Sequence, residues 1–214
     1  SARLGIATMA ICPVLVSVSM AAINSLIRQV SLRADYDFLT QVYSRSGLYE
    51  ALKHEETHRH SRFLTVMLLD IDYFKSINDN YGHECGDRVL ASFARQVQQV
   101  VGEDGMVARM GGEEFAVVVN SGDARHGYEL AERIRTTVAN HPFTWRQQTL
   151  SLTVSIGLGS GKAEAWQLTE VFNKLMTEAD DHLYRSKKAG RNRTSARVAD
   201  EHITAATGHE TELR

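Results

Sequence analysis

A pair of glycines runs directly into a pair of glutamates at residues 111–114, and an apolar run follows from Phe115 to Val119. Paired glycines between two strand-like segments favour a tight hairpin, because glycine adopts positive φ at no steric cost. The two carboxylates would then lie at the exit of a rigid turn mounted on a buried strand. On these residues alone, a solvated hairpin tip and a ligand-binding turn are equally good interpretations.

A second acidic motif lies upstream, at the end of another apolar run. Residues 63–69 form an apolar run, interrupted only by Thr65, as expected for a central strand, and Asp-Ile-Asp follows at 70–72. A charged Asp70 at the end of a buried strand needs a partner or a cation. If this strand lies beside the hairpin, Asp70 and a hairpin glutamate form an oxygen-rich pocket suited to Mg²⁺. The alternation of side chains leaves open whether Glu113 or Glu114 joins it, and Asp72 is alternatively a helix N-cap.

Composition limits the partners that the chain can have. Its 214 residues, 43% hydrophobic and 23% charged, suffice for one well-buried domain plus an additional segment. A formal net charge of −2 gives no chain-wide attraction to polyanions, so we expect no nucleic-acid partner. Cys12 and Cys85 form no metal-binding motif, which suits a reducing compartment. Any phosphate chemistry must therefore come from local sites.

The first segment differs from the rest because no charge occurs between Arg3 and Arg28. As a helix, residues 4–27 would span about 36 Å, enough to cross a hydrocarbon core of about 30 Å. We therefore expect a retained transmembrane helix within residues 1–27, with a dimerising helix or a buried core helix as alternatives. The positive charges that follow it, Arg28 and Arg33, favour a cytoplasmic location for the remainder.

Periodic patterns predict alternating helices and strands along the rest of the chain. Residues 28–36 are predicted to be a helical linker, and the polar residues 196–214 a disordered tail. Between them, the patterns predict helices over 46–60, from about 73 to 81, over 89–101 and 128–139, and from 168 to Gly190, and strands over 63–69, 106–110, 115–119 and 149–158. This order predicts an α+β domain, an α/β sandwich with a largely antiparallel sheet.

Several longer motifs occur in a fixed order over residues 37–195. The segment from Asp70 to His83 is followed by Gly86-Asp87 and then by residues 109–115. Further matching segments are Asp37, Leu39-Thr40, Arg45, Thr153 to Gly157, Ala179-Asp180, Leu183-Tyr184, Lys187 and Gly190 to Arg193. With this spacing, residues 36–195 resemble the GGDEF family of diguanylate cyclases, in a Gly-Gly-Glu-Glu-Phe variant.

The resemblance implies a palm-like fold shared with class III nucleotide cyclases and polymerases. It implies the condensation of two GTP molecules into cyclic di-GMP with release of pyrophosphate, in a homodimer whose two sites face each other. With the predicted first helix, it implies a protein of the inner membrane of a bacterium. An alternative is a catalytically silent domain that binds GTP or only a partner protein, although the chain keeps every acidic residue that catalysis needs.

The resemblance also implies roles for individual residues. Asp70 and Glu113 would bind Mg²⁺ or Mn²⁺ through their carboxylates and Ile71 through its carbonyl, with Glu113 also the base for the attacking 3′-hydroxyl. Asn78 and Asp87 would bind guanine, since a carboxylate accepts from its N1–H and N2–H₂ edge. The cations that would hold the triphosphate are Lys75, Lys187 and Arg191.

Some of these residues also have plain structural interpretations. Asp87 is alternatively the N-cap of a helix from Arg88, and Lys187 and Arg191 are alternatively charges that complement a helix end. An Arg-x-x-Asp motif accompanies product inhibition in the family, but residues 102–105 read Gly-Glu-Asp-Gly here, so no such site is expected. The H-E-x-x-H pattern at 54–58 lies in a polar segment without a further ligand, and we interpret it as a solvated helix face.

Overall fold

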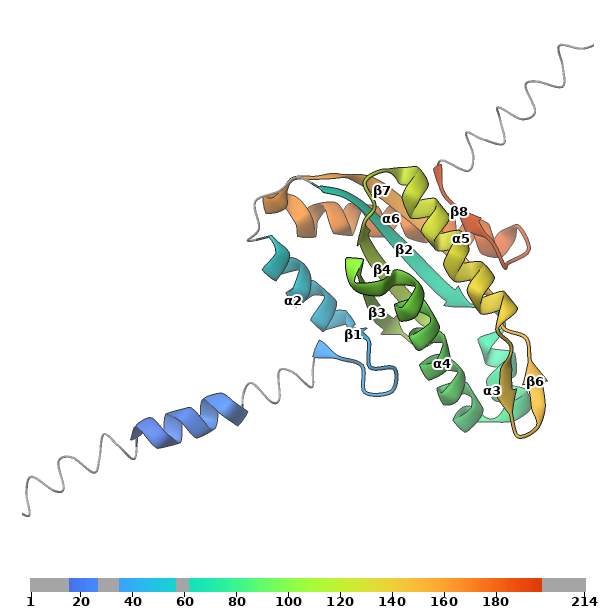
Figure 1. The fold of residues 1–214 in the computed structure, drawn as a ribbon, viewed down its shortest axis with the longest axis horizontal. Coiled ribbons are helices and arrows are strands. Elements are labelled where there is room, and N and C mark those ends of the chain that lie inside the picture. Colours follow the sequence, from blue (N-terminus) through green and yellow to red (C-terminus); the bar gives the residue numbers. More distant parts are fainter. Residues whose placement is uncertain (1–15, 27–34, 57–61, 198–214) are drawn as a thin grey trace, which may run out of the picture.

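The computed structural model describes residues 16–26, 35–56 and 62–197, and a six-stranded sheet forms its centre (Figure 1). The strand order is β1-β3-β4-β2-β7-β8. These strands are β1 (Tyr43–Ser44), β2 (Arg62–Ile71), β3 (Gly105–Gly111), β4 (Glu114–Asn120), β7 (Val154–Ala163) and β8 (Thr194–Ser195). The long strands pair antiparallel, whereas the two-residue edge strands β1 and β8 pair parallel. The sheet is therefore mixed, with the predicted antiparallel arrangement in its centre.

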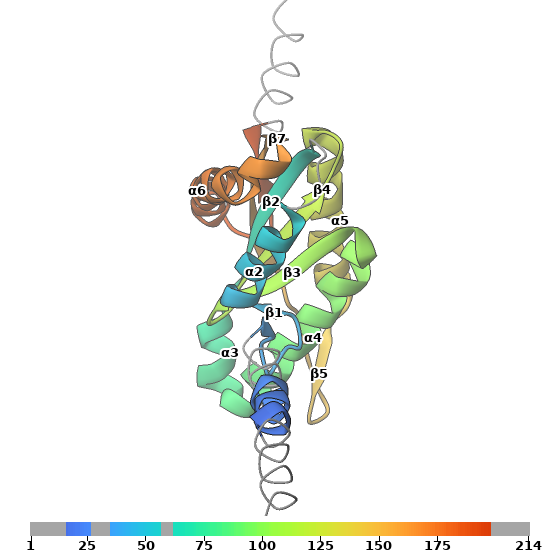
Figure 2. The ribbon, with the colours of Figure 1, turned by 90° about the vertical axis from the view of Figure 1, so that its left-hand side faces the viewer.

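Helices cover both faces of this sheet. On one face lie α2 (Arg45–Glu55) and α6 (Leu168–Lys188), and on the other lie α3 (Phe74–Tyr81), α4 (His83–Val101) and α5 (Ala124–Asn140). Figure 2 views the sheet from its side, with α6 and α5 on opposite sides of it. Two 3₁₀ turns, Gly102–Asp104 and Ala165–Gln167, precede β3 and α6. The layers form the predicted α/β sandwich.

The position of β2 between two layers of helices explains why its sequence is almost entirely apolar from Phe63 to Leu69. Val66 and Leu68 pack into the cluster beneath α2 and α6, whereas Met67 and Leu69 pack into the cluster beneath α4 and α5. Successive side chains of a strand point to opposite faces, so a strand covered on both faces favours apolar residues at consecutive positions. The buried exception, Thr65, lies 2.8 Å from Ser121 Oγ and 2.9 Å from Ser160 Oγ through its hydroxyl. The apolar run ends at Asp70, where the sheet reaches the edge of the core.

Strand β7 lets α6 approach the sheet closely because two of its residues are glycines. A Cβ atom at Gly157 would collide with the backbone of Ala179 and Leu183, and one at Gly159 with the backbone of Leu175. The helix backbone therefore lies directly against the strand. This contact sets the position of every side chain that α6 directs towards the end of β2.

Several element boundaries differ from the sequence-based predictions, and two of the differences change the fold locally. The strand predicted over 149–158 is divided between β6 (Gln148–Leu150), which pairs with β5 (Phe143–Trp145) in a separate hairpin, and β7. Arg146 and Gln147 form the turn of that hairpin with φ of 43° and 68°, values that sequence patterns assign to glycine or asparagine. Helix α4 begins at His83, six residues before the predicted start, because Gly82 both ends α3 and precedes α4.

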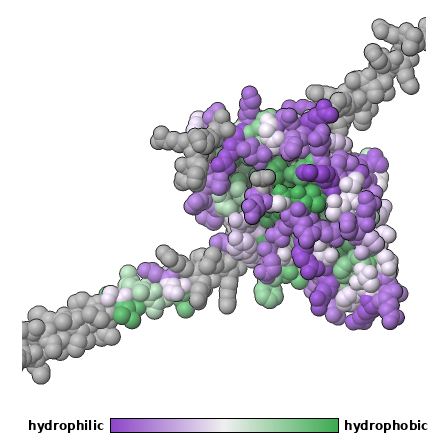
Figure 3. Space-filling model, in the orientation of Figure 1, coloured by the Kyte–Doolittle hydropathy of each residue, from purple (hydrophilic) through white to green (hydrophobic). Residues whose placement is uncertain are grey.

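The predicted transmembrane helix lies only partly within the described residues. Residues 16–26 form a helix, and Figure 3 shows green, apolar surface on this segment. Its exposed large apolar side chains are Val16, Val18, Met20, Ile23 and Leu26. Across 16–26, 35–56 and 62–197, the structure holds no helix with the length and apolar character that a membrane span requires. The rest of the predicted span, and the linker up to residue 34, lie outside the described residues.

The C-terminal end of the domain extends slightly past residue 195. Ala196 is buried in the cluster beneath α4 and α5, and Arg197 Nη2 lies 3.2 Å from Glu178 Oε1. The predicted tail from residue 198 onward lies outside the described residues.

Candidate active site

The turn between β3 and β4 is the hairpin that the paired glycines predict. Gly112 has a φ of 54°, in the left-handed region that glycine enters without steric cost. The pairing register shifts between Arg109 and Gly111, which marks an irregularity just before the turn. Glu113 therefore completes a sharp turn, and Glu114 begins β4.

Arg109 ties this hairpin to the segment by which the chain enters the domain. Its Nε donates to the Gly112 carbonyl at 3.0 Å, and its Nη1 donates to Asp37 Oδ1 at 3.2 Å. Asp37 also accepts from the Thr40 amide at 2.9 Å. Burial opposes ionisation of Asp37, but the hydrogen bonds from Thr40 and Arg109 hold its pKa below the usual value. The hairpin is thus anchored by a charged network.

Asp70 lies beside both glutamates of the hairpin. In the β2–β4 ladder Asp70 is directly opposite Glu114, and directly opposed residues have side chains on the same face. The Ile71 amide approaches the Glu113 carbonyl at 3.4 Å, so the first glutamate joins the end of β2 through its backbone. The structure confirms that strand and hairpin meet, the condition on which the predicted carboxylate pocket depended.

The carboxylates at this edge concentrate negative charge. Burial raises the pKa of the Asp70 carboxyl above its usual value, and repulsion from Glu113 and Asp72 adds to the rise. Burial also raises the pKa of Glu114, with repulsion from Asp70 and Asp180 adding to it. The role of Asp180 was not predicted, since its position on α6 carries no sequence signal that it faces the hairpin. A site of this kind favours a bound cation.

Lys187 supplies one cation from the protein itself. Its Nζ donates to Asp70 Oδ2 at 2.9 Å, with the aspartate side chain 14% exposed and the lysine 35%. Lys187 opposes the rise in the pKa of Asp70. Lys187 was predicted either to hold phosphate or to complement a helix end. In the structure it lies inside the carboxylate site.

The oxygen ligands fit a divalent metal that also binds phosphate. Within the described ranges, no three residues among His, Cys, Asp and Glu gather as a complete protein-only metal site. Mg²⁺ commonly uses one or two carboxylates and fills the remaining positions with water and phosphate oxygens. Asp70, the hairpin glutamates and the Ile71 carbonyl offer such a partial set.

Asp72 is not a helix N-cap, contrary to the alternative drawn from the sequence. Tyr73 precedes α3 with a φ of 56° and no side-chain cap. The buried Asp72 carboxylate instead accepts from Thr153 Oγ1 and Ser155 Oγ, each at 2.7 Å, and from the Asn192 amide at 3.0 Å. Asp72 therefore joins β2 to the region of β7 and to the loop after α6.

Asn78 and Asp87 lie at the packed junction of α3 and α4. A Cβ atom at Gly86 would collide with Asn78 Oδ1, so the glycine makes room for the amide side chain. The N-cap alternative for Asp87 is wrong, because α4 already begins at His83 and Asp87 is an exposed residue within it. Lys75 is exposed on α3, and its Nζ lies 2.7 Å from Asp79 Oδ2.

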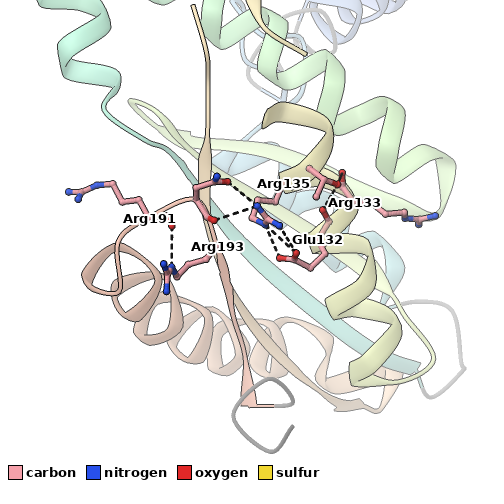
Figure 4. Close-up of polar contacts among 7 residues, drawn as sticks. Glu132, Arg133, Arg135, Arg191 and Arg193 are labelled. Carbon is pink, nitrogen blue, oxygen red and sulfur yellow. Dashed lines mark hydrogen bonds and ion pairs between the residues drawn. The ribbon is translucent and has the colours of Figure 1, made fainter. Parts of the chain in front are cut away.

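Arg191 lies in the loop between α6 and β8. Its guanidinium carbon lies 4.8 Å from the centre of the Tyr73 ring, which precedes α3. The predicted phosphate-binding arginine is thus held at the same edge of the sheet as Asp72. The loop that carries it is shown in Figure 4.

Solved structures of similar fold define the class of this protein. The coiled coil and GGDEF domain of DgcB from Caulobacter crescentus, solved in complex with c-di-GMP, superimposes with a TM-score of 0.70 at 28% identity, covering 84% of this chain and 94% of that one. Diguanylate cyclase SiaD from Pseudomonas aeruginosa, solved with its activator SiaC, gives a TM-score of 0.67 at 27% identity, covering 90% and 76%.

Residues 34–193 match the family described as "Diguanylate cyclase, GGDEF domain", and the chain belongs to that family. It is 70% identical over 195 residues to the probable diguanylate cyclase DgcF of Escherichia coli K12, covering 91% of this chain and 62% of DgcF. It is 36% identical over 174 residues to diguanylate cyclase DgcP of Pseudomonas aeruginosa, covering 80% of this chain and 25% of DgcP. The chain thus spans less than two thirds of these relatives.

Proposed function

We propose that this protein is a diguanylate cyclase that condenses two GTP molecules into cyclic di-GMP and pyrophosphate. The observation that carries the proposal is the meeting of Asp70, the Glu113-Glu114 hairpin and Lys187 at the end of β2. Membership of the family and the names of its relatives support the same reaction. A silent domain would have no need to keep a cluster of mutually repelling carboxylates beside a lysine.

The substrate lies across the end of the sheet in this proposal. Asn78 and Asp87, at the α3–α4 junction, bind the guanine edge, where adenine offers no matching donors. Lys75, Lys187 and Arg191 hold the triphosphate. Lys187 must then exchange its contact with Asp70 for contacts with phosphate oxygens.

Asp70, Glu113 and the Ile71 carbonyl would hold Mg²⁺ or Mn²⁺. The metal supplies positive charge that offsets the charge developing at the phosphate under attack. Glu113 takes the proton from the attacking 3′-hydroxyl. Glu114, directly opposite Asp70, adds negative charge on the same face and is the second candidate ligand.

The assembly and location follow from the reaction and the first segment. Each domain holds one GTP and the product joins two, so the active form is a homodimer with facing sites. Residues 4–36 form the dimerising element and attach the protein to the inner membrane of a bacterium, with the domain in the cytoplasm. Product inhibition through an Arg-x-x-Asp motif is absent, since residues 102–105 lack the arginine.

The reaction is tested by incubating the protein with GTP and Mg²⁺ and measuring pyrophosphate and cyclic di-GMP. We expect both products from the parent protein, none from Glu113→Gln, and none when ATP replaces GTP. Cyclic di-GMP binding to Glu113→Gln tests the absence of the product-inhibition site, and we expect no tight binding. A parent protein that binds GTP but forms no product would refute the proposed activity.

A further inference from the structure

The loop that carries Arg191 has an unusual backbone. Gly190, Arg191 and Asn192 have φ of 113°, 63° and 43°, so three consecutive residues lie at positive φ and two of them are not glycine. Such conformations are unfavourable for residues with a Cβ atom and persist only where surrounding contacts impose them. The position of the Arg191 side chain therefore depends on what holds this loop.

Three of those contacts are made by backbone groups of α6 and β7 and by Asp72, the residue that follows β2. The Arg191 amide donates to the Ser186 carbonyl at 3.0 Å, and the Ile156 amide donates to the Arg193 carbonyl at 3.0 Å. The Asn192 amide donates to Asp72 Oδ2 at 3.0 Å. These bonds hold the loop to α6, to β7 and to the end of β2.

A further contact comes from α5, on the opposite face of the sheet from α6. Arg135 Nη1 donates to Asn192 Oδ1 at 3.0 Å and approaches the Asn192 carbonyl at 3.5 Å. Figure 4 shows Arg135 between Glu132 and the loop, while Arg191 extends away from it on the other side. Arg135 therefore contacts the residue next to Arg191 and not Arg191 itself.

Arg135 is itself fixed in place by Glu132. Its Nε lies 3.0 Å from Oε1, and its Nη2 lies 2.8 Å from Oε2, in the two-pronged geometry that orients a guanidinium most strongly. The two side chains are 20% and 30% exposed. Burial opposes ionisation of Glu132, but the hydrogen bonds from Arg135 hold its pKa below the usual value. The pair is a rigid support rather than a mobile surface contact.

We propose that Arg135, oriented by Glu132, is a positioning residue for triphosphate binding. It holds Asn192 so that Arg191 lies over Tyr73 at the edge of the site, and it touches no substrate atom. This inference rests on the proposed function, in which Arg191 binds the triphosphate. It predicts that a residue on α5 affects the phosphate end of GTP and leaves the guanine end unaffected.

The test measures how tightly the full chain binds two ligands. One is a GTP analogue with a methylene bridge between the α- and β-phosphates, added with Mg²⁺, and the other is guanosine, which has no phosphate. We expect Arg135→Met to weaken binding of the analogue by about tenfold or more, the scale that misplacing a binding group can cost, with guanosine affinity unchanged. Arg125→Met is the matched control, because Arg125 also pairs with a glutamate on α5, but both side chains are exposed. The control should bind both ligands as the parent does.

Two further variants separate positioning from general damage to the fold. Asn192→Gly removes the acceptor side chain and still permits positive φ, so it should weaken analogue binding as Arg135→Met does. In the double variant Arg135→Met/Arg191→Met, the loss should equal that of Arg191→Met alone, because Arg135 acts only through Arg191.

Three outcomes would overturn the inference. In the first, Arg135→Met and Arg125→Met bind the analogue equally tightly. In the second, Arg135→Met weakens the binding of guanosine and of the analogue by the same factor. In the third, the losses of Arg135→Met and Arg191→Met add up in the double variant. A parent protein that binds neither ligand would overturn the proposed function as well, and this result is visible before any variant is compared.

Discussion

Replacing Lys187 by methionine removes the cation from the carboxylate site and keeps an unbranched side chain that is one atom shorter. Its Nζ lies 2.9 Å from Asp70 Oδ2, with the lysine 35% and the aspartate 14% exposed. Exposed pairs contribute up to about 1 kcal/mol, and disrupting a buried pair costs about 3–5 kcal/mol. Because water screens a lysine that is about one third exposed, we expect Lys187→Met to lower the free energy of unfolding by about 2 kcal/mol at neutral pH.

The pH dependence of this loss follows from Asp70. Burial already raises its pKa, and Lys187 opposes that rise. A carboxyl whose folded-state pKa is raised destabilises the fold above that pKa, and the cost is relieved as pH falls through it. Without Lys187 the pKa of Asp70 rises further, so the deficit should be full near neutral pH and should shrink as the solution is acidified towards the usual range of an aspartate.

Urea unfolding followed by tryptophan fluorescence at several pH values measures the effect. Lys188→Met is the matched control, since the neighbouring lysine lies over the Tyr184 ring instead of Asp70. In Asp70→Asn/Lys187→Met, part of the lost stability should return, because no charge is left unpaired. If Lys187→Met and Lys188→Met lost equal stability with the same pH dependence, the reasoning would be refuted.

Three other substitutions test the packing that supports the site. Gly86→Ala should raise KM for GTP, because its Cβ displaces the Asn78 side chain, and steady-state kinetics would show it. Gly157→Ala should lower the free energy of unfolding by about 1–3 kcal/mol in the same urea assay, because its Cβ would meet the backbone of α6. The control, Gly161→Ala, should change it little, because its Cβ would meet only one side-chain carbon, at 3.5 Å. Asp72→Asn should lower Tm and raise KM together, because an amide oxygen cannot accept all three of its hydrogen bonds.

The centre of the fold could be predicted from the sequence because its signals are local. The apolar run at 63–69 requires a strand covered on both faces, and paired glycines require a turn. Both features occur where they were predicted, and together they place Asp70 beside the hairpin. The sequence also predicted α5 and α6, because apolar residues recur at helical spacing along one face of each.

Features that depend on contacts between distant segments could not be predicted in the same way. The use of Asp72 as an acceptor for Thr153 and Ser155 depends on the register of β2 with β7, which no local pattern encodes. The same holds for Asp180, whose neighbour is Glu114.

The start of α4 was predicted too late for a local reason, because Gly82 was interpreted only as the end of a helix.

The glycines of β7 have a consequence for exchanging parts between related proteins. One continuous stretch of chain contains Asp180, Lys187 and the loop with Arg191. This stretch packs on the sheet through the α6 backbone, which contacts β7 at Gly157 and Gly159. A graft of this stretch into another scaffold would carry, as a unit, the charges that we propose to bind phosphate. Only a host strand that also has glycines at the two contact points could accept it. Whether the graft fits would therefore depend on glycines at the positions of Gly157 and Gly159 and not on the charges themselves.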